Sequence, residues 1–154
     1  AHNVEVVPRL QLVIRVARCS WDRSLVVLVS SKEEGSAVTK SSLMVALGET
    51  REEDLDAMQR LRAPDVDLLT IGQYLRPSKR HAAVERYVEP AEFAEYEQAG
   101  LEMGFGFIAS GPLVRSSYLS AVAFLSGFLA VNQDSGETPE MNRFGKKRSM
   151  AVLT

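Results

Sequence analysis

Short apolar runs without alternation recur along the first part of the chain. Residues 43–47 read Leu-Met-Val-Ala-Leu, and residues 66–72 read VDLLTIG. Runs of this kind are typical of strands that are covered on both faces. We therefore predict buried strands over residues 37–47, 66–72 and 105–110, and within residues 2–10 a further short β-rich segment that Pro8 stops.

Helical signals fill the stretches between these runs. Ser20 predicts the N-cap of a helix that extends to about residue 34, although three β-branched valines within it weaken the prediction. Thr50 and Glu53 form a T-x-x-E capping box ahead of a second helix, which ends before Pro64. Pro90 predicts the first turn of a third helix, which extends to residue 103.

The predicted order is β, α, β, α, β, loop, α, β. Alternation of this kind implies parallel strands joined by crossover helices. The sequence thus predicts the α/β class with about four strands, as half of a barrel or as one open sheet. Residues 119–154 break the alternation and carry no motif, so we expect a folded part over residues 1–118 and a divergent C-terminal tail of unknown role over residues 119–154.

Polar or glycine-bearing segments follow the predicted strands directly, at residues 3–5, 48–50, 72–74 and 110–118. In parallel sheets, functional residues gather at the C-terminal ends of the strands. We therefore expect a site at this edge of the sheet.

Composition narrows the classes of function. The 154 residues are 45% hydrophobic and 25% charged, with a formal net charge of −2, and no basic block stands out. Nucleic acid is therefore a poor candidate partner. The apolar run at residues 119–131 is interrupted by serines and a glycine and is shorter than the roughly 20 residues of a membrane span, so no membrane partner is predicted either. The single cysteine, Cys19, excludes a disulfide framework and any metal site built only from cysteines of this chain.

Four segments of the chain together resemble the lipoyl synthases, a family of radical S-adenosylmethionine (SAM) enzymes. They are HNVEVVPRL at residues 2–10, TKSSLMVALGET at 39–50, DLLTIGQYLRPS at 67–78 with RYVEPAEF at 86–93, and GPLVRSSY at 111–118. Their order and spacing agree with the family pattern, so the resemblance covers residues 1–118. It implies the second half of a partial (β/α) barrel of radical SAM type. Because the chain starts AHNVEVV without Met, we expect it to be the C-terminal part of a longer enzyme.

The resemblance implies a sulfurtransferase that inserts two sulfur atoms at C6 and C8 of a protein-bound octanoyl group, which forms the lipoyl cofactor. SAM would provide a 5′-deoxyadenosyl radical, and one of two [4Fe–4S] clusters would donate the sulfur. The implied partners are an octanoylated lipoyl carrier domain or protein and an electron donor such as ferredoxin or flavodoxin. The implied location is intracellular: bacterial cytoplasm, mitochondrion or plastid.

The resemblance also assigns roles to individual residues. It implies that Asn3 and Glu49 help to hold SAM and that Lys40, Gln73 and Leu75 line the same pocket. Ser117 would ligate the auxiliary cluster, with Ser116 as the second choice. Taken alone, each residue has an ordinary interpretation. Asn3 would be a turn residue, Glu49 a charge at a helix start and Lys40 a strand end. Gln73 would be a loop amide, Leu75 a core side chain, and Ser116 and Ser117 a pair of capping serines.

Three features depart from the family pattern. Ser42 and Ala46 stand where the family has glycines, and Cys19 matches neither of the cysteine motifs that bind the two clusters. The chain alone therefore lacks the means to bind either cluster, and a non-catalytic remnant or a partner-binding half-barrel is the alternative function. The basic loop with Arg76, Lys79, Arg80 and Arg86 is either a contact for an acidic carrier or a solvated face.

Overall fold

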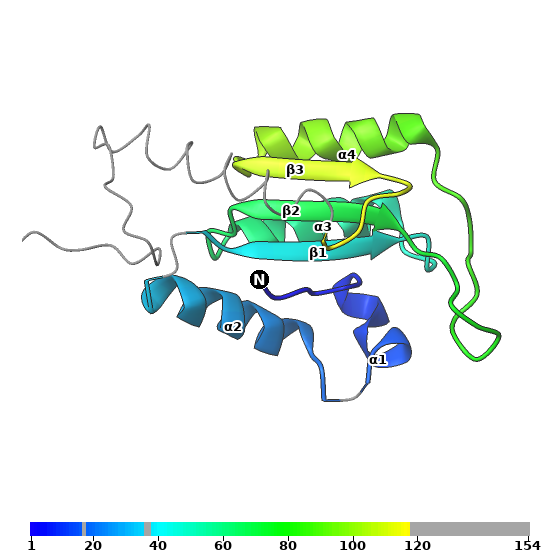
Figure 1. Ribbon diagram of the computed structural model, residues 1–154, viewed down its shortest axis with the longest axis horizontal. Coiled ribbons are helices and arrows are strands. Elements are labelled where there is room, and N and C mark those ends of the chain that lie inside the picture. The colour runs from blue at the N-terminus through cyan, green and yellow to red at the C-terminus, as the bar shows by residue number, and fades with distance from the viewer. Residues whose placement is uncertain (17, 36–37, 118–154) are drawn as a thin grey trace, which may run out of the picture.

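The computed structural model describes residues 1–16, 18–35 and 38–117 of the chain (Figure 1). The tail predicted over residues 119–154 lies outside this range. The described elements are a 3₁₀ turn at Pro8–Leu10, the helices α1 (Gln11–Ile14), α2 (Trp21–Glu33), α3 (Arg51–Arg62) and α4 (Pro90–Glu102), and the strands β1 (Lys40–Val45), β2 (Leu68–Gln73) and β3 (Phe107–Gly111).

The three strands form one parallel sheet in the order β1-β2-β3. Lys40 lies opposite Leu68, and Leu68 lies opposite Phe107, so the strands start level with one another. Helix α3 connects β1 to β2 and α4 connects β2 to β3, while α2 lies along the outer side of β1 (Figure 1). The predicted α/β class is confirmed, and the sheet is compatible with part of a barrel.

The prediction of a strand over residues 2–10 is wrong in its extent. This segment runs alongside β1, where the His2 N–H donates to the Lys40 carbonyl at 2.9 Å and the Glu5 N–H donates to the Ser42 carbonyl at 3.0 Å. Only Glu5 and Leu43 form a bridge, because Glu5 adopts a left-handed φ of 70° that ends the extended conformation. Pro8 then starts the 3₁₀ turn. The described sheet therefore has three strands and one flanking segment.

The predicted helix starts are confirmed at the level of their hydrogen bonds. The Ser20 hydroxyl accepts from the Arg23 N–H at 3.3 Å at the start of α2. Thr50 and Glu53 make both bonds of the capping box at the start of α3, at 3.3 Å and 2.9 Å. The valines of α2 do not prevent the helix, because Trp21 and Leu28 bury its other face.

The two faces of the sheet differ in composition. Leu43, Leu69 and Ile71 are fully buried in the core. This face meets α4, since a Cβ atom on Gly100 would come within 1.8 Å of the Ile108 side chain. The opposite face carries small or polar residues, and the register aligns Ser42 with Thr70 and Met44 with Gly72. Small side chains leave room over this face, and that room is the candidate site.

Candidate functional site

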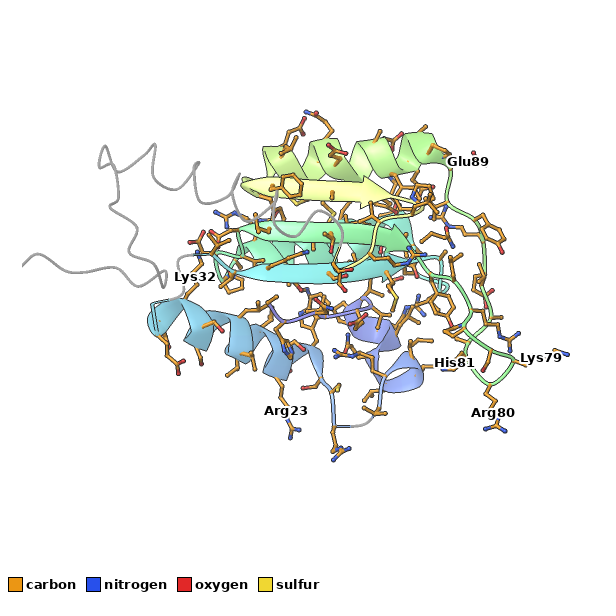
Figure 2. All side chains as sticks on the ribbon, viewed as in Figure 1. Arg23, Lys32, Lys79, Arg80, His81 and Glu89 are labelled. Carbon is orange, nitrogen blue, oxygen red and sulfur yellow. The ribbon has the colours of Figure 1, made fainter. Side chains whose placement is uncertain are left out.

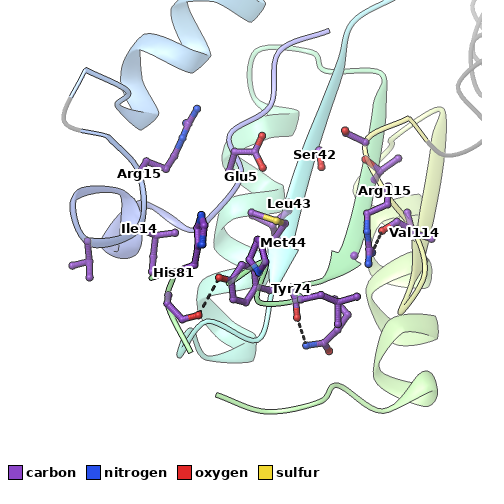
Figure 3. Close-up of a pocket in the computed structure, with 18 of the residues that line it drawn as sticks. Glu5, Ile14, Arg15, Ser42, Leu43, Met44, Tyr74, His81, Val114 and Arg115 are labelled. Carbon is purple, nitrogen blue, oxygen red and sulfur yellow. Dashed lines mark hydrogen bonds between the residues drawn. The ribbon is translucent and has the colours of Figure 1, made fainter. Parts of the chain in front are cut away.

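A cavity of about 560 Å³ opens over the carboxyl-terminal half of β1 and β2 (Figure 3). The strands contribute its floor, and three separate segments contribute its walls. The floor is Ser42, Met44, Thr70 and Gly72, and the walls come from the N-terminal segment with α1, the loop that follows β2, and residues 114–116. Of the four polar segments predicted at this edge of the sheet, those at 3–5, 72–74 and 110–118 contribute lining residues and the one at 48–50 does not.

Thr70 provides an unsatisfied hydroxyl in the floor of the cavity. Its side chain is 1% exposed, and its Oγ1 has no hydrogen-bond partner among the described residues. A buried hydroxyl without a partner costs free energy, which a polar group of a ligand in the cavity would recover. Ser42 lies beside it on β1, level in the sheet register, and is also buried.

The segment after β3 folds back over the sheet and covers part of the cavity floor. The Val114 carbonyl oxygen lies 2.2 Å from the place where a Cβ atom on Gly72 would stand, so only glycine admits this approach. The Lys40 ammonium donates a hydrogen bond to the Ser116 carbonyl. Arg115 donates to the Val114 carbonyl at 2.6 Å. Residues 114–116 are therefore fixed above β1 and β2.

Arginine side chains surround the mouth of the cavity. Figure 3 shows Arg15 on one side and Arg115 on the other. Arg80 also lines the cavity, and Glu5 is the one carboxylate among the described lining residues. Burial is the main cause that lowers the pKa of Lys40, which stands behind the Ser116 carbonyl. The mouth of the cavity thus favours anionic groups.

Glu49 stabilises the turn between β1 and α3. Its carboxylate accepts hydrogen bonds from the Ala46 N–H and, at 2.9 Å, from the Leu47 N–H. Ala46 has a φ of 83° and Gly48 a φ of 98°, so this turn passes twice through the left-handed region. Glu49 is buried and does not line the cavity. Its position explains a local structural role, while its predicted role in SAM binding stays a prediction.

Gln73 uses its whole amide to hold the loop that follows β2. Its Nε2 donates to the Tyr74 carbonyl at 3.0 Å and the Arg86 carbonyl at 3.1 Å, and its Oε1 accepts from the Val88 N–H at 2.9 Å. Gln73 and Leu75 both line the cavity, and Leu75 is 47% exposed. Gln73 therefore shapes the wall, and Leu75 offers an apolar surface at the mouth.

The structure brings some of the predicted residues to the cavity and leaves others beside it. Ser116 lines the cavity, and Lys40 reaches it through the Ser116 carbonyl. Asn3 is partly buried beside β1, and Ser117 is exposed one residue beyond the lining. The roles predicted for all of these residues stay predictions.

The sequence analysis did not find the floor residue Thr70 or the wall residue Arg15, and it included Glu5 only within the polar segment at residues 3–5. Thr70 carries a readable signal, because it is a polar residue two positions before Gly72, between the apolar residues Leu69 and Ile71. Alternation places Thr70 and Gly72 on the same face of β2. Arg15 has no such signal, because the short helix α1 brings it to the cavity.

A buried network of hydrogen-bonded polar side chains lies on the helix side of the sheet, below the loop that Gln73 holds. Asp54 is fully buried, and the Tyr96 hydroxyl lies 2.8 Å from its Oδ2 and 3.0 Å from Glu92 Oε1. Arg86 ends this network with an ion pair to Glu92. Burial raises the pKa of Asp54 to about 8. The single Tyr96 proton cannot serve two carboxylates, so a protonated Asp54 donates to Tyr96 and Tyr96 donates to Glu92.

The described residues form no group of three or more His, Cys, Asp or Glu side chains that could hold a metal ion. Cys19 is partly buried and free. No described helix has the length and apolar character that a membrane crossing requires.

Comparison with known proteins finds one group of similar proteins. No protein-family model matches the chain. A lipoyl synthase of an Anaeromyxobacter species is 53% identical over 131 residues, which cover 84% of this chain and 45% of that protein. The mitochondrial lipoyl synthases of Coprinopsis cinerea and Rattus norvegicus are 50% and 51% identical over 129 and 131 residues, which again cover 84% of this chain but 33% and 35% of those proteins. Over its aligned residues the chain is similar to a partial region of the lipoyl synthases.

The chain spans only about a third to just under half the length of these lipoyl synthases. The resemblance noted in the sequence is thereby confirmed for a partial region of the family. Three lipoyl synthase-like motifs of the chain converge on one place in the fold, since residues 39–50 and 67–78 supply the floor and residues 114–116 supply the segment above it.

The structure locates both departures from the lipoyl synthase pattern. At position 46, where the resemblance implies glycine, Ala46 adopts a φ of 83° that glycine reaches without strain. Ser42, the other departure, lies on the cavity floor, where a side chain narrows the space.

Proposed function

We propose that this chain supplies one wall of the active site of a lipoyl synthase, which inserts two sulfur atoms at C6 and C8 of a protein-bound octanoyl group. The observation that carries the proposal is the cavity at the ends of β1 and β2, with the unpartnered Thr70 hydroxyl in its floor and the RSS segment, residues 115–117, above it. The identity of about half of the aligned residues with lipoyl synthases supports the same reading.

The cavity suits SAM as a ligand. Thr70 offers a free hydroxyl to a polar group, Gly72 and Ser42 keep the floor low, and Leu75 offers an apolar edge. We assign Gln73 and Leu75 to the wall of this pocket, and Asn3, Lys40 and Glu49 to contacts at its edges. When bound, SAM would supply the group that abstracts hydrogen atoms from the substrate. The residues of this chain would orient SAM and exclude water from it.

The iron–sulfur clusters need ligands that these 154 residues do not contain, since Cys19 is their only cysteine. The chain would contribute one ligand, the Ser117 hydroxyl, with Ser116 as the second choice. Ser117 is exposed beside the cavity, where a cluster held by another part of the enzyme could reach it. A serine oxygen is a harder ligand than thiolate and a weaker match for iron–sulfur, so it would be readily replaced.

The proposed partners follow from the proposed reaction. They are an octanoylated lipoyl carrier domain or protein, as the substrate, and an electron donor such as ferredoxin or flavodoxin. The proposed location is intracellular. The similar proteins include ones whose names give a mitochondrial location and ones from bacteria.

The second candidate is a non-catalytic half-barrel that binds a partner. The left-handed φ of Ala46 and the side chain of Ser42 in the cavity favour it, because both stand where the lipoyl synthase pattern has glycine. A protein that retained the fold but no longer bound SAM would tolerate both residues.

A chimera separates the two candidates. The aligned segment of the Anaeromyxobacter lipoyl synthase is replaced by this chain, and mass spectrometry follows the addition of two sulfur atoms to an octanoylated carrier. Calorimetry with S-adenosylhomocysteine measures binding independently of turnover. We expect both sulfur insertion and binding, and a chimera that folds but does neither supports the non-catalytic candidate.

Two variants of the chimera test the residue assignments. Thr70→Val, which replaces the free hydroxyl by a methyl group, is expected to weaken S-adenosylhomocysteine binding about tenfold. Ser117→Ala is expected to abolish sulfur insertion without changing that affinity. If Ser116→Ala abolishes the insertion and Ser117→Ala does not, the ligand is Ser116.

A further inference from the structure

The loop between β2 and α4 ends in a compact cationic tip that projects from the sheet. Figure 2 shows Lys79, Arg80 and His81 at this tip, on the side of the molecule where the cavity opens. We define the cationic tip as residues 76–81, which are all exposed.

The cationic tip is held in one conformation by its own hydrogen bonds. The Arg76 guanidinium donates to the His81 carbonyl at 2.9 Å and to the Lys79 carbonyl at 2.6 Å. The Ser78 hydroxyl accepts from the Arg80 N–H at 3.3 Å and lies 2.9 Å from His81 Nδ1. Arg76 is thus a brace inside the turn, and Lys79 and Arg80 are presented outward on a preformed surface.

The base of the same loop is fastened to the sheet. The Glu85 N–H donates to the Ala46 carbonyl at 3.1 Å, and the Tyr74 hydroxyl donates to the Ala82 carbonyl at 3.0 Å. Gln73 holds the Arg86 carbonyl, as described above. A preformed loop loses little conformational entropy when a partner binds, so its contacts contribute fully to affinity.

The outward charges of the tip have no partner within the described part of the chain. Each ion pair among the described residues involves other cations, such as Arg9 with Glu53 and Arg86 with Glu92. The side chains of Lys79 and Arg80 make no hydrogen bond or ion pair there. Arg80 also lines the cavity mouth, where Arg15 and Arg115 add positive charge. The tip and the mouth form one cationic surface, with Glu5 as the carboxylate among its lining residues.

We propose that the cationic tip is a docking surface for an acidic segment of the protein that carries the substrate side chain. The surface adjoins the cavity, so a partner that rests on Lys79 and Arg80 could extend a modified lysine into the mouth. An extended nucleic acid would need a longer basic stripe, whereas this surface is short and lies on a chain with a formal net charge of −2. The nature of the cargo rests on the proposed function, but the acidic character of the partner rests on the tip alone.

A binding measurement with the whole 154-residue chain tests the proposal. Fluorescence anisotropy compares four short labelled peptides, which are acidic or neutralised by Asn and Gln around one lysine that is either octanoylated or free. We expect the acidic peptides to bind about tenfold more tightly than the neutral ones, with an advantage that shrinks as salt is added. Equal affinity for acidic and neutral peptides would overturn the docking surface.

Matched charge reversals locate the contact. Lys79→Glu with Arg80→Glu is expected to remove the tenfold preference for acidic peptides. Arg18→Glu with Arg23→Glu is the control, since both arginines are exposed and Arg23 lies on α2, away from the tip (Figure 2). Lys79→Arg with Arg80→Lys keeps the charge and should keep the preference. Loss of the preference in the control pair, or its survival in the reversed pair, would contradict the assignment.

The peptide set separates this proposal from the proposed function. Tight binding of the acidic peptide with free lysine supports the docking surface even if the octanoyl group adds nothing. Binding that depends on the octanoyl group and not on the acidic residues supports the proposed function and overturns the docking surface. Single-stranded DNA of equal charge is the competitor, and tighter binding of this DNA would overturn the proposal of a protein partner.

Discussion

The carbonyl oxygen of Val114 lies 2.2 Å from the position that a Cβ atom on Gly72 would occupy. This approach lets the segment after β3 fold back over the sheet, where Lys40 holds the Ser116 carbonyl. The TIGQYL and RSSY motifs are far apart in sequence. The position of the RSSY serines nevertheless depends on the absence of a side chain at the glycine of TIGQYL. A change at Gly72 should act on the RSS segment.

Gly72→Ala is expected to displace residues 114–116 and to destabilise the fold by about 1 to 3 kcal/mol, because a methyl group cannot share the space of a carbonyl oxygen. Urea unfolding measures the loss. Gly106→Ala is the matched control, since a Cβ atom there would stand 3.6 Å from its nearest neighbour, the Asp67 carbonyl. Equal losses for the two variants would show that the close approach at Gly72 has no energetic weight.

Ala46→Gly is expected to stabilise the protein by about 0.5 to 1 kcal/mol. The left-handed φ of 83° strains alanine and not glycine, and the relief exceeds the extra backbone entropy that glycine brings to the unfolded state. Thermal and urea unfolding measure the gain. Ala57→Gly, in the interior of α3, serves as the opposite control and should destabilise. A loss of stability in both variants would mean that Ala46 fits its turn without strain.

Local signals explain which parts of the fold the sequence predicts well. The capping box of Thr50 and Glu53 is complete within one turn, and β1 and β2 each contain a short apolar run that is too short for most helices. The prediction for residues 2–10 is wrong in extent because it also depends on local signals alone. The valines of this segment favour a strand, but the left-handed φ of Glu5 is imposed by the place of the segment beside β1, which no neighbour in sequence reveals.

The candidate site was predicted in place but not in detail. The strand ends identify the right edge of the sheet, because that rule depends only on the order of elements. The return of the RSS segment over Gly72 depends on a contact between residues more than forty positions apart, which local pattern cannot show. The Glu49 carboxylate accepts a hydrogen bond from the Leu47 N–H, and this bond likewise depends on the exact shape of the turn between β1 and α3.

Lys40→Met is expected to loosen the RSS segment without unfolding the sheet. Methionine keeps the buried stem but removes the ammonium that binds the Ser116 carbonyl. Amide hydrogen exchange at residues 114–117 should accelerate about tenfold, while the core amides of β2 keep their protection. Lys32→Met is the control, since Lys32 pairs with Asp65 and Asp67 away from the RSS segment. Faster exchange in both variants would mean that the effect is global.

The carboxyl of Asp54 links stability to pH. Its pKa of about 8 in the folded protein is well above the ordinary value of 3.8, and burial is the main cause. Between these two values the unfolded chain releases the proton and the folded chain keeps it. The free energy of unfolding should therefore fall by ~1.4 kcal/mol per pH unit across this window on account of Asp54, and this contribution should level off above pH 8.

Asp54→Asn is expected to abolish this contribution. Asparagine retains the shape and a donor to the Tyr96 hydroxyl, so Tyr96 can still donate to Glu92. The variant should gain stability over the parent protein steadily as pH rises from 4 to 8, as urea unfolding at several pH values would measure. Asp56→Asn, exposed on the same helix, supplies the control and should show no such trend. A stability difference between Asp54→Asn and the parent that stays constant with pH would mean that Asp54 is ionised in the folded protein. The proton that we place on Asp54 would then be absent, and the single Tyr96 proton could be donated to only one of the Asp54 and Glu92 carboxylates at a time.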